Sequence, residues 1–301
     1  MSRAPSATLD SRPALPAVIE LLKPITWFPP MWAFGCGAVS MSASSGAGWP
    51  AILLGVALAG PLVCAASQAV NDWFDRHVDA INEPHRPIPS GRVPGRWGLY
   101  LAQIWTALSL LVATALGPVV VGATIVGLLL AWAYSAPPFR LKSNGWWGNS
   151  AVAICYEGLA WVTGAAVMAG GNVPDGRTIT LAVLYSIGAH GIMTLNDFKA
   201  IEGDIKTGIA SLPVQLGVDG AARAACLIMA LPQFVVVALL VAWGREWHAA
   251  AVAAVLLAQF VLMARFLAQP RERAAWYSAS GVSLYVSGML VSAFGVRALL
   301  G

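Results

Sequence analysis

Charged residues are scarce in this sequence. Asp, Glu, Lys and Arg make up only 11% of the 301 residues, whereas soluble domains contain about 25%. This scarcity excludes an ordinary cytosolic domain. The sequence is instead 58% hydrophobic, and its apolar residues form long runs separated by short polar breaks. Because a helix needs roughly 20 apolar residues to cross a bilayer, these runs predict membrane-spanning helices.

The uncharged runs predict nine such helices. Their expected bounds are 19–41, 51–74, 97–116, 119–135, 149–169, 178–196, 221–243, 247–267 and 276–298. No Ser/Gly-rich linker or charge block divides them. We therefore expect one all-α membrane domain over residues 17–301, behind a flexible N-terminus at residues 1–16.

Paired cysteines and a removable signal are also missing. The four cysteines are scattered through apolar spans without C-x-x-C spacing, which argues against a disulfide framework or a zinc site. Residues 1–16 contain neither an apolar h-region nor a cleavage-site pattern, so we expect no cleaved signal peptide.

The positive charge follows membrane topology. All 18 Lys and Arg residues except Arg177, Arg245 and Arg297 fall at the N-terminus, near helix ends that face it, or in loops after even-numbered spans. By the positive-inside rule, the N-terminus and these loops are cytoplasmic, and nine spans place the C-terminus on the opposite side. The formal net charge of +4 therefore does not indicate a nucleic-acid partner.

One acidic motif occurs twice. Residues 71–79 (NDWFDRHVD) end the second predicted span, and residues 196–204 (NDFKAIEGD) end the sixth, 125 residues later. Both begin Asn-Asp-aromatic and carry an acid eight residues after the Asn. Paired motifs of this kind indicate two related halves, about 17–145 and 146–301, with a functional site where the halves face each other.

On a helix, the polar residues of the first motif lie within about 100° of one another: Asn71, Asp72, Asp75 and Asp79. Clustered carboxylates at a membrane boundary need a compensating cation. Oxygen ligands suit Mg²⁺, which binds through few carboxylates together with substrate phosphates. The alternative is a solvated helix end, but that would not require the motif to recur.

The second motif has one acid fewer. On a regular helix Asn196, Asp197 and Asp204 share a face, and Ala200 replaces the counterpart of Asp75. Glu202 would contribute only if the helix unwound near Gly203. Two acidic helix ends that face one another would hold two Mg²⁺ ions across a diphosphate.

Other polar residues could serve the same site. Arg86, Arg140 and Lys142 follow acidic or Pro-rich segments and could clamp phosphate oxygens, although cytoplasmic loops carry basic residues in any case. Glu157 and His190 lie inside predicted spans. Intramembrane ionisable residues are candidates for function, here for contact with an acceptor, and a structural hydrogen bond is the alternative.

The repeated motif and the nine spans resemble the UbiA-type intramembrane prenyltransferases. The strings DAINEPHRPIPSG at 79–91, YSAPP at 134–138 and NGWWGN at 144–149 are similar to the chlorophyll and bacteriochlorophyll synthase branch. The resemblance implies a bacterial inner-membrane enzyme that esterifies the propionate of a chlorophyllide or bacteriochlorophyllide. The donor would be geranylgeranyl or phytyl diphosphate, with Mg²⁺ as cofactor and possible complexes with other pigment-biosynthesis or photosynthetic membrane proteins.

The resemblance also implies residue roles. The catalytic, Mg²⁺-binding acids would be Asp72, Asp75, Asp79, Asp197 and Asp204. The diphosphate would further contact Asn71, Asn196, Arg86, Arg140 and Lys142, and the acceptor His190 or Glu157. Two alternatives are an enzyme that prenylates an aromatic ring carbon and a transporter or pigment assembly factor.

Overall fold

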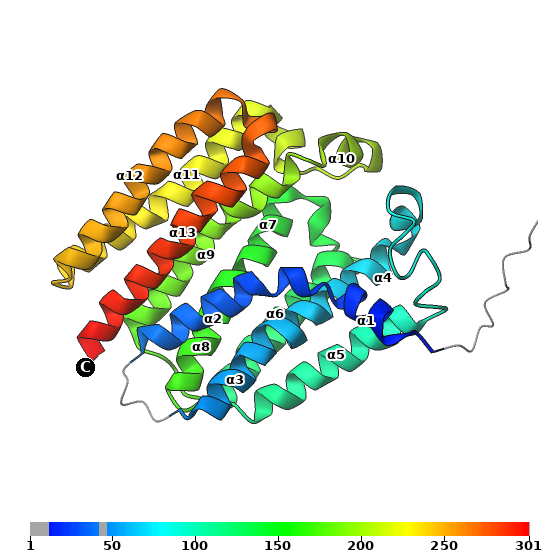
Figure 1. Cartoon of the computed structure of the whole chain (residues 1–301), viewed down its shortest axis with the longest axis horizontal. Helices are drawn as coiled ribbons and strands as arrows, with labels where there is room; N and C mark the ends of the chain where they lie inside the picture. The colour runs from blue at the N-terminus through cyan, green and yellow to red at the C-terminus, as the bar shows by residue number, and fades with distance from the viewer. Residues whose placement is uncertain (1–11, 42–46, 301) are drawn as a thin grey trace, which may run out of the picture.

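The computed structural model describes residues 12–41 and 47–300, whose backbone is predominantly helical (Figure 1). The helices are α1 (Leu15–Leu22), α2 (Phe28–Ser40), α3 (Trp49–Ala57), α4 (Ala65–Asn82), α5 (Trp97–Thr114), α6 (Pro118–Ser135), α7 (Gly145–Ala153), α8 (Ala160–Met168), α9 (Gly176–Asp197), α10 (Ile201–Thr207), α11 (Leu212–Ala242), α12 (Glu246–Ala268) and α13 (Pro270–Leu300). Short 3₁₀ turns precede α2 and α7.

Eight helical segments in the described residues are long and apolar enough to cross a membrane. Two of them contain a π-helical stretch. α3 continues through η2 (Leu58–Cys64) into α4, and α7 continues through η4 (Ile154–Leu159) into α8. The eight segments account for the second to ninth predicted spans, so the expected all-α membrane bundle is confirmed.

The first predicted span, 19–41, is wrong as a single helix. α1 ends at Leu22, Lys23 has a φ of 47°, and α2 begins only at Phe28. Pro24 has no N–H with which to continue α1, and the left-handed conformation of Lys23 redirects the chain. The break places Lys23 beside α4, where its ammonium reaches an acid.

α2 packs against α8 through two glycines. A Cβ on Gly37 would stand 1.9 Å from the carbonyl oxygen of Trp161, and one on Gly164 would stand 2.0 Å from that of Phe34. Small residues let helix backbones approach closely in membranes, where van der Waals packing drives association. The contact fixes the position of α2, whose Pro30 lines a cavity of about 420 Å³.

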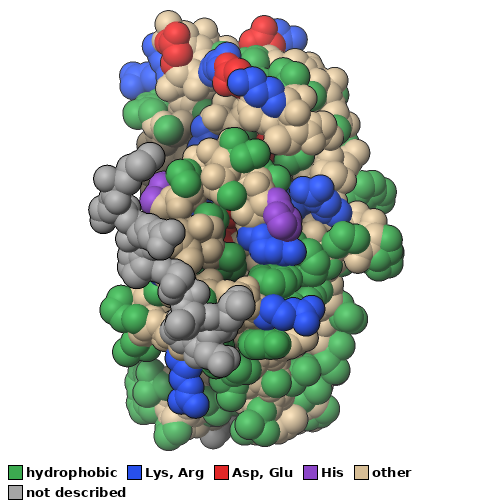
Figure 2. Space-filling model, turned by 90° about the vertical axis from the view of Figure 1, so that its right-hand side faces the viewer, with side chains coloured by type: hydrophobic (Ala, Val, Ile, Leu, Met, Phe, Trp, Pro, Cys, Tyr) green, Lys and Arg blue, Asp and Glu red, His purple; other side chains and the backbone are tan. Residues whose placement is uncertain are grey.

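Both acidic motifs lie at one end of the bundle. α4 and α9 finish there, while α5 and α13 begin there, on the right and upper side of Figure 1. Figure 2 views the molecule from the right of Figure 1, and Lys and Arg side chains gather on this face. A basic end of this kind is what the positive-inside rule leads us to expect of one membrane side.

Replacing Gly37 with Leu should destabilise the protein, because no side chain fits between α2 and α8. Overpacking of this kind costs about 1–3 kcal/mol. Thermal denaturation of the detergent-solubilised protein measures the effect. Gly35→Leu is the matched control, because a Cβ at Gly35 meets no atom within 4 Å. An equal loss of stability in both variants would contradict the proposed contact.

Candidate active site

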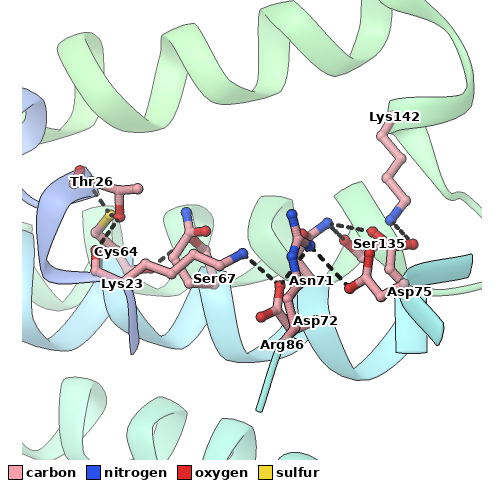
Figure 3. A network of polar contacts seen from close by, with 12 residues as sticks. Lys23, Thr26, Cys64, Ser67, Asn71, Asp72, Asp75, Arg86, Ser135 and Lys142 are labelled. Carbon is pink, nitrogen blue, oxygen red and sulfur yellow. Dashed lines mark hydrogen bonds and ion pairs between the residues drawn. The ribbon is translucent and has the colours of Figure 1, made fainter. Parts of the chain in front are cut away.

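Two acids of the first motif share one cation. Asp72 and Asp79 are 2% and 6% exposed. Nη1 of Arg86 donates to Oδ2 of Asp79 at 3.0 Å and lies 3.7 Å from Oδ1 of Asp72. Nζ of Lys23 donates to the same Asp72 oxygen at 2.6 Å, as Figure 3 shows. These partners offset the cost of holding carboxylates away from water.

The third acid, Asp75, has separate partners. Nδ2 of Asn71 donates to Oδ2 of Asp75 at 3.0 Å and lies 3.1 Å from Oγ of Ser135. Nζ of Lys142 donates to Oδ1 of Asp75, as Figure 3 shows. Nη2 of Arg140 lies 4.0 Å from the same oxygen. All three basic residues expected at the site therefore contact an acid of the first motif.

In the absence of a ligand, basic side chains of the protein itself neutralise the three acids of the first motif. Three segments far apart in sequence provide it: the turn after α1, the loop after α4 and the loop after α6. Burial lowers the pKa of Lys142, and the adjacent Asp75 carboxylate only partly offsets this effect. The carboxylates and cations lie together where a phosphate ligand could exchange partners with both.

The second motif does not lie on one helix. α9 ends at Asp197, whose Oδ2 accepts a hydrogen bond of 3.0 Å from Nδ2 of Asn149. A turn follows, and Asp204 belongs to α10. The expectation that Asn196, Asp197 and Asp204 share one helical face is therefore wrong. The side chain of Phe198, buried against Phe266 of α12, occupies the turn between the two helices.

Asp204 and Glu202 differ in their surroundings. Partial burial raises the pKa of Asp204. The Glu202 side chain is 63% exposed and pairs with Arg271 of α13. The carboxylate of Glu202 therefore faces Arg271 in this structure, and its replacement of the acid missing at Ala200 stays a prediction.

Residues of both motifs line one cavity of about 420 Å³. Asn71 from α4 and Asn196 and Asp197 from α9 form part of its polar lining, so the motifs face a common space as the internal repeat predicts. The apolar lining includes Pro29, Pro30, Val63, Leu130, Val152 and Cys155. A cavity with both kinds of wall suits a ligand with an ionic head and a hydrocarbon tail.

The donor atoms fit Mg²⁺ that arrives with a phosphate ligand. Among the described residues, no three His, Cys, Asp or Glu side chains form a ready metal cluster. Oδ2 of Asp72 is nevertheless buried without a hydrogen-bond partner. Mg²⁺ binds through one or two carboxylates, keeps several waters and takes its remaining ligands from substrate phosphates. Asp197 lines the cavity, whereas Asp72, Asp75 and Asp79 lie outside its lining, on the helix that contributes Asn71 to it.

The two intramembrane candidates lie outside this cavity lining. Nδ1 of His190 is 3.1 Å from Oγ of Ser150, and its ring stacks on Trp146. Glu157 lies in η4 and is 4% exposed. Their contact with an acceptor stays a prediction.

Two residues at the site were not expected from the sequence. The sequence indicates Lys23 only as one of the basic residues that set the membrane orientation. It indicates Asn149 only as part of the NGWWGN segment at 144–149. Both contact their acids from almost 50 positions away, since Lys23 and Asp72 are 49 residues apart and Asn149 and Asp197 are 48. Their polarity at the edge of apolar spans is the one available signal.

Comparison with known proteins identifies the family. The model of the UbiA prenyltransferase family matches residues 28–288. The chain belongs to the UbiA prenyltransferase family. It is therefore a multi-pass membrane enzyme of the prenyltransferase class, and the transporter alternative is excluded.

Its relatives cover nearly the whole chain. It is 57% identical to the bacteriochlorophyll synthase 33 kDa chain of Cereibacter sphaeroides, over 94% of this chain and 93% of that one. It is 52% identical to the protein of the same name from Rhodobacter capsulatus, over 95% and 96%. The structure of a UbiA homologue from Archaeoglobus fulgidus bound to GPP and Mg²⁺ has a TM-score of 0.71 at 21% identity, over 89% and 99%. That likeness shows the fold.

Replacing Asp75 with Asn should lower the rate of prenyl transfer by roughly 100-fold or more, as removal of one electrostatic contact to a transition state commonly does. The change keeps the side-chain shape and removes the charge that faces Lys142. Product formation per unit of membrane-inserted protein measures the effect. Asp219→Asn, at an exposed position of α11, is the control, and wild-type turnover by Asp75→Asn would refute the assignment.

Proposed function

We propose that this enzyme transfers a C20 prenyl group from geranylgeranyl or phytyl diphosphate to the propionate of bacteriochlorophyllide or chlorophyllide. The near full-length identity of 57% to a bacteriochlorophyll synthase chain is the observation that carries the proposal. The cavity supports it independently, because its lining combines polar residues of both motifs with an apolar wall.

The diphosphate binds between the two motifs in this proposal. Arg86, Arg140 and Lys142 already contact carboxylates of the first motif, and their N–H groups suit phosphate oxygens equally well. Asp72, Asp75, Asp79, Asp197 and Asp204 would hold Mg²⁺, which would further neutralise the leaving diphosphate. The basic side chains stabilise the negative charge that develops there as the allylic C–O bond breaks.

The acceptor requires positioning more than activation. A propionate is ionised at neutral pH, so one of its oxygens can bond to the allylic carbon without a general base. The apolar wall, which includes Leu130 and Val152, holds the hydrocarbon chain and keeps water from capturing the allylic cation. The products are a prenyl ester and free diphosphate.

We further propose that the enzyme resides in a bacterial inner membrane with its N-terminus and the basic end cytoplasmic and its C-terminus on the other side. The Lys and Arg residues around α4 and α6 support this orientation. Both acidic motifs would then open to the cytoplasm.

Purified protein in lipid nanodiscs tests the function. With geranylgeranyl diphosphate and Mg²⁺, we expect mass spectrometry to detect a prenyl ester of chlorophyllide a or bacteriochlorophyllide a. We expect no product with 4-hydroxybenzoate, which represents the aromatic-ring alternative. Chelation by EDTA should stop the reaction, and added Mg²⁺ should restore it. Transfer to 4-hydroxybenzoate alone would overturn the assigned acceptor.

A further inference from the structure

A second cavity, of about 370 Å³, lies at the same end of the bundle. It is formed where the end of α9 meets the beginning of α13. Asn196 lines both this cavity and the first one. A ligand in the second cavity would therefore lie one side chain away from the proposed diphosphate site.

The second cavity carries two positive charges. Lys199 and Arg271 both line it, and both are exposed. Arg271 already pairs with the carboxylate of Glu202, so its guanidinium is oriented to bind a carboxylate. The two side chains of that pair are 53% and 63% exposed, and exposed ion pairs are weak. An incoming carboxylate can therefore displace Glu202 or share its cation.

One wall of the second cavity is built from small residues. Ala274, Ala275, Ser278 and Ala279 all line it. They form two pairs four positions apart on α13, so they share one face of the helix. Because their side chains are short, this helix face is smooth enough for a flat ring to pack against it. The first cavity, in contrast, suits a flexible hydrocarbon chain.

We propose that the second cavity binds the carboxylate-bearing edge of the macrocyclic acceptor, with Arg271 and Lys199 pairing with its propionate. The inference rests on the proposed function and adds the acceptor site to it. Because Asn196 lines both cavities, the two sites adjoin at this residue, and the propionate oxygen meets the allylic carbon beside its side chain. Glu202 holds Arg271 in place until the acceptor arrives.

Kinetics of Arg271→Gln and Lys199→Gln test the inference. Hydrogen bonds to charged groups are worth enough that the KM for chlorophyllide a should rise about 10- to 100-fold in Arg271→Gln. The KM for geranylgeranyl diphosphate should stay unchanged, and Arg271→Lys should recover part of the loss. Arg265→Gln and Lys206→Gln are matched controls, since both residues are exposed at the same end and neither lines the cavity.

Acceptor binding gives an independent readout. Titration followed by the macrocycle's absorbance should show that Arg271→Gln weakens binding of chlorophyllide a. The same variant should not weaken binding of its propionate methyl ester, which lacks the charge. Equal effects on acid and ester, or a change in donor KM alone, would overturn the inference. If no transfer occurs in the wild type, the proposed function fails, while this titration still tests the cavity.

Two further measurements distinguish acceptor binding from lipid binding in the second cavity. If Arg271 and Lys199 bind a lipid headgroup instead, their effects will disappear in nanodiscs of purely zwitterionic lipid, which would also overturn the inference. Ser278→Phe should fill the cavity and abolish macrocycle binding without altering donor KM. Ser280→Phe, on another face of α13, should bind the macrocycle as the wild type does.

Discussion

Neutralisation of the α4 carboxylates is the interaction on which the rest of the site depends. Three acids on one helix at a membrane edge would repel one another and resist burial. Lys23, Arg86 and Lys142 resolve this conflict, and each comes from a different connecting segment. The ion pairs thus hold three connecting segments against one helix end.

In the proposed reaction the same side chains serve the ligand. With a diphosphate and Mg²⁺ bound, the carboxylates would hold the metal, and the ammonium and guanidinium groups would pair with phosphate oxygens instead. Positive and negative charges are therefore paired both in the empty site and in the site with ligand bound. Breaking such a buried pair without replacement would be costly, which favours donor and metal binding together over metal binding alone.

The features that could be predicted from the sequence are those that depend on amino-acid composition and on the repeat of a motif. The apolar runs located eight spans, and the repeated Asn-Asp-aromatic motif correctly indicated that α4 and α9 face one space. The break at Lys23 was not predicted, because average hydropathy does not detect one left-handed residue before a proline. The contact of Asn149 with the second motif was not predicted, because its partner, Asp197, lies on another helix. Asp204 was misplaced because the helical wheel assumes a continuous helix, and α9 ends before it.

The two π-helical segments form part of the wall of the first cavity. η2 and η4 both border the cavity, and Cys64 and Tyr156 meet at its wall with 3.3 Å between sulfur and hydroxyl oxygen. Nε2 of Gln68 donates to the same hydroxyl at 3.2 Å. A π-helical turn contains an extra residue and so rotates the side chains that follow it. Tyr156 faces the cavity in this register, and Glu157, the next residue, turns into the surrounding protein. η2 and η4 thus bring a thiol and a phenol together at the cavity wall.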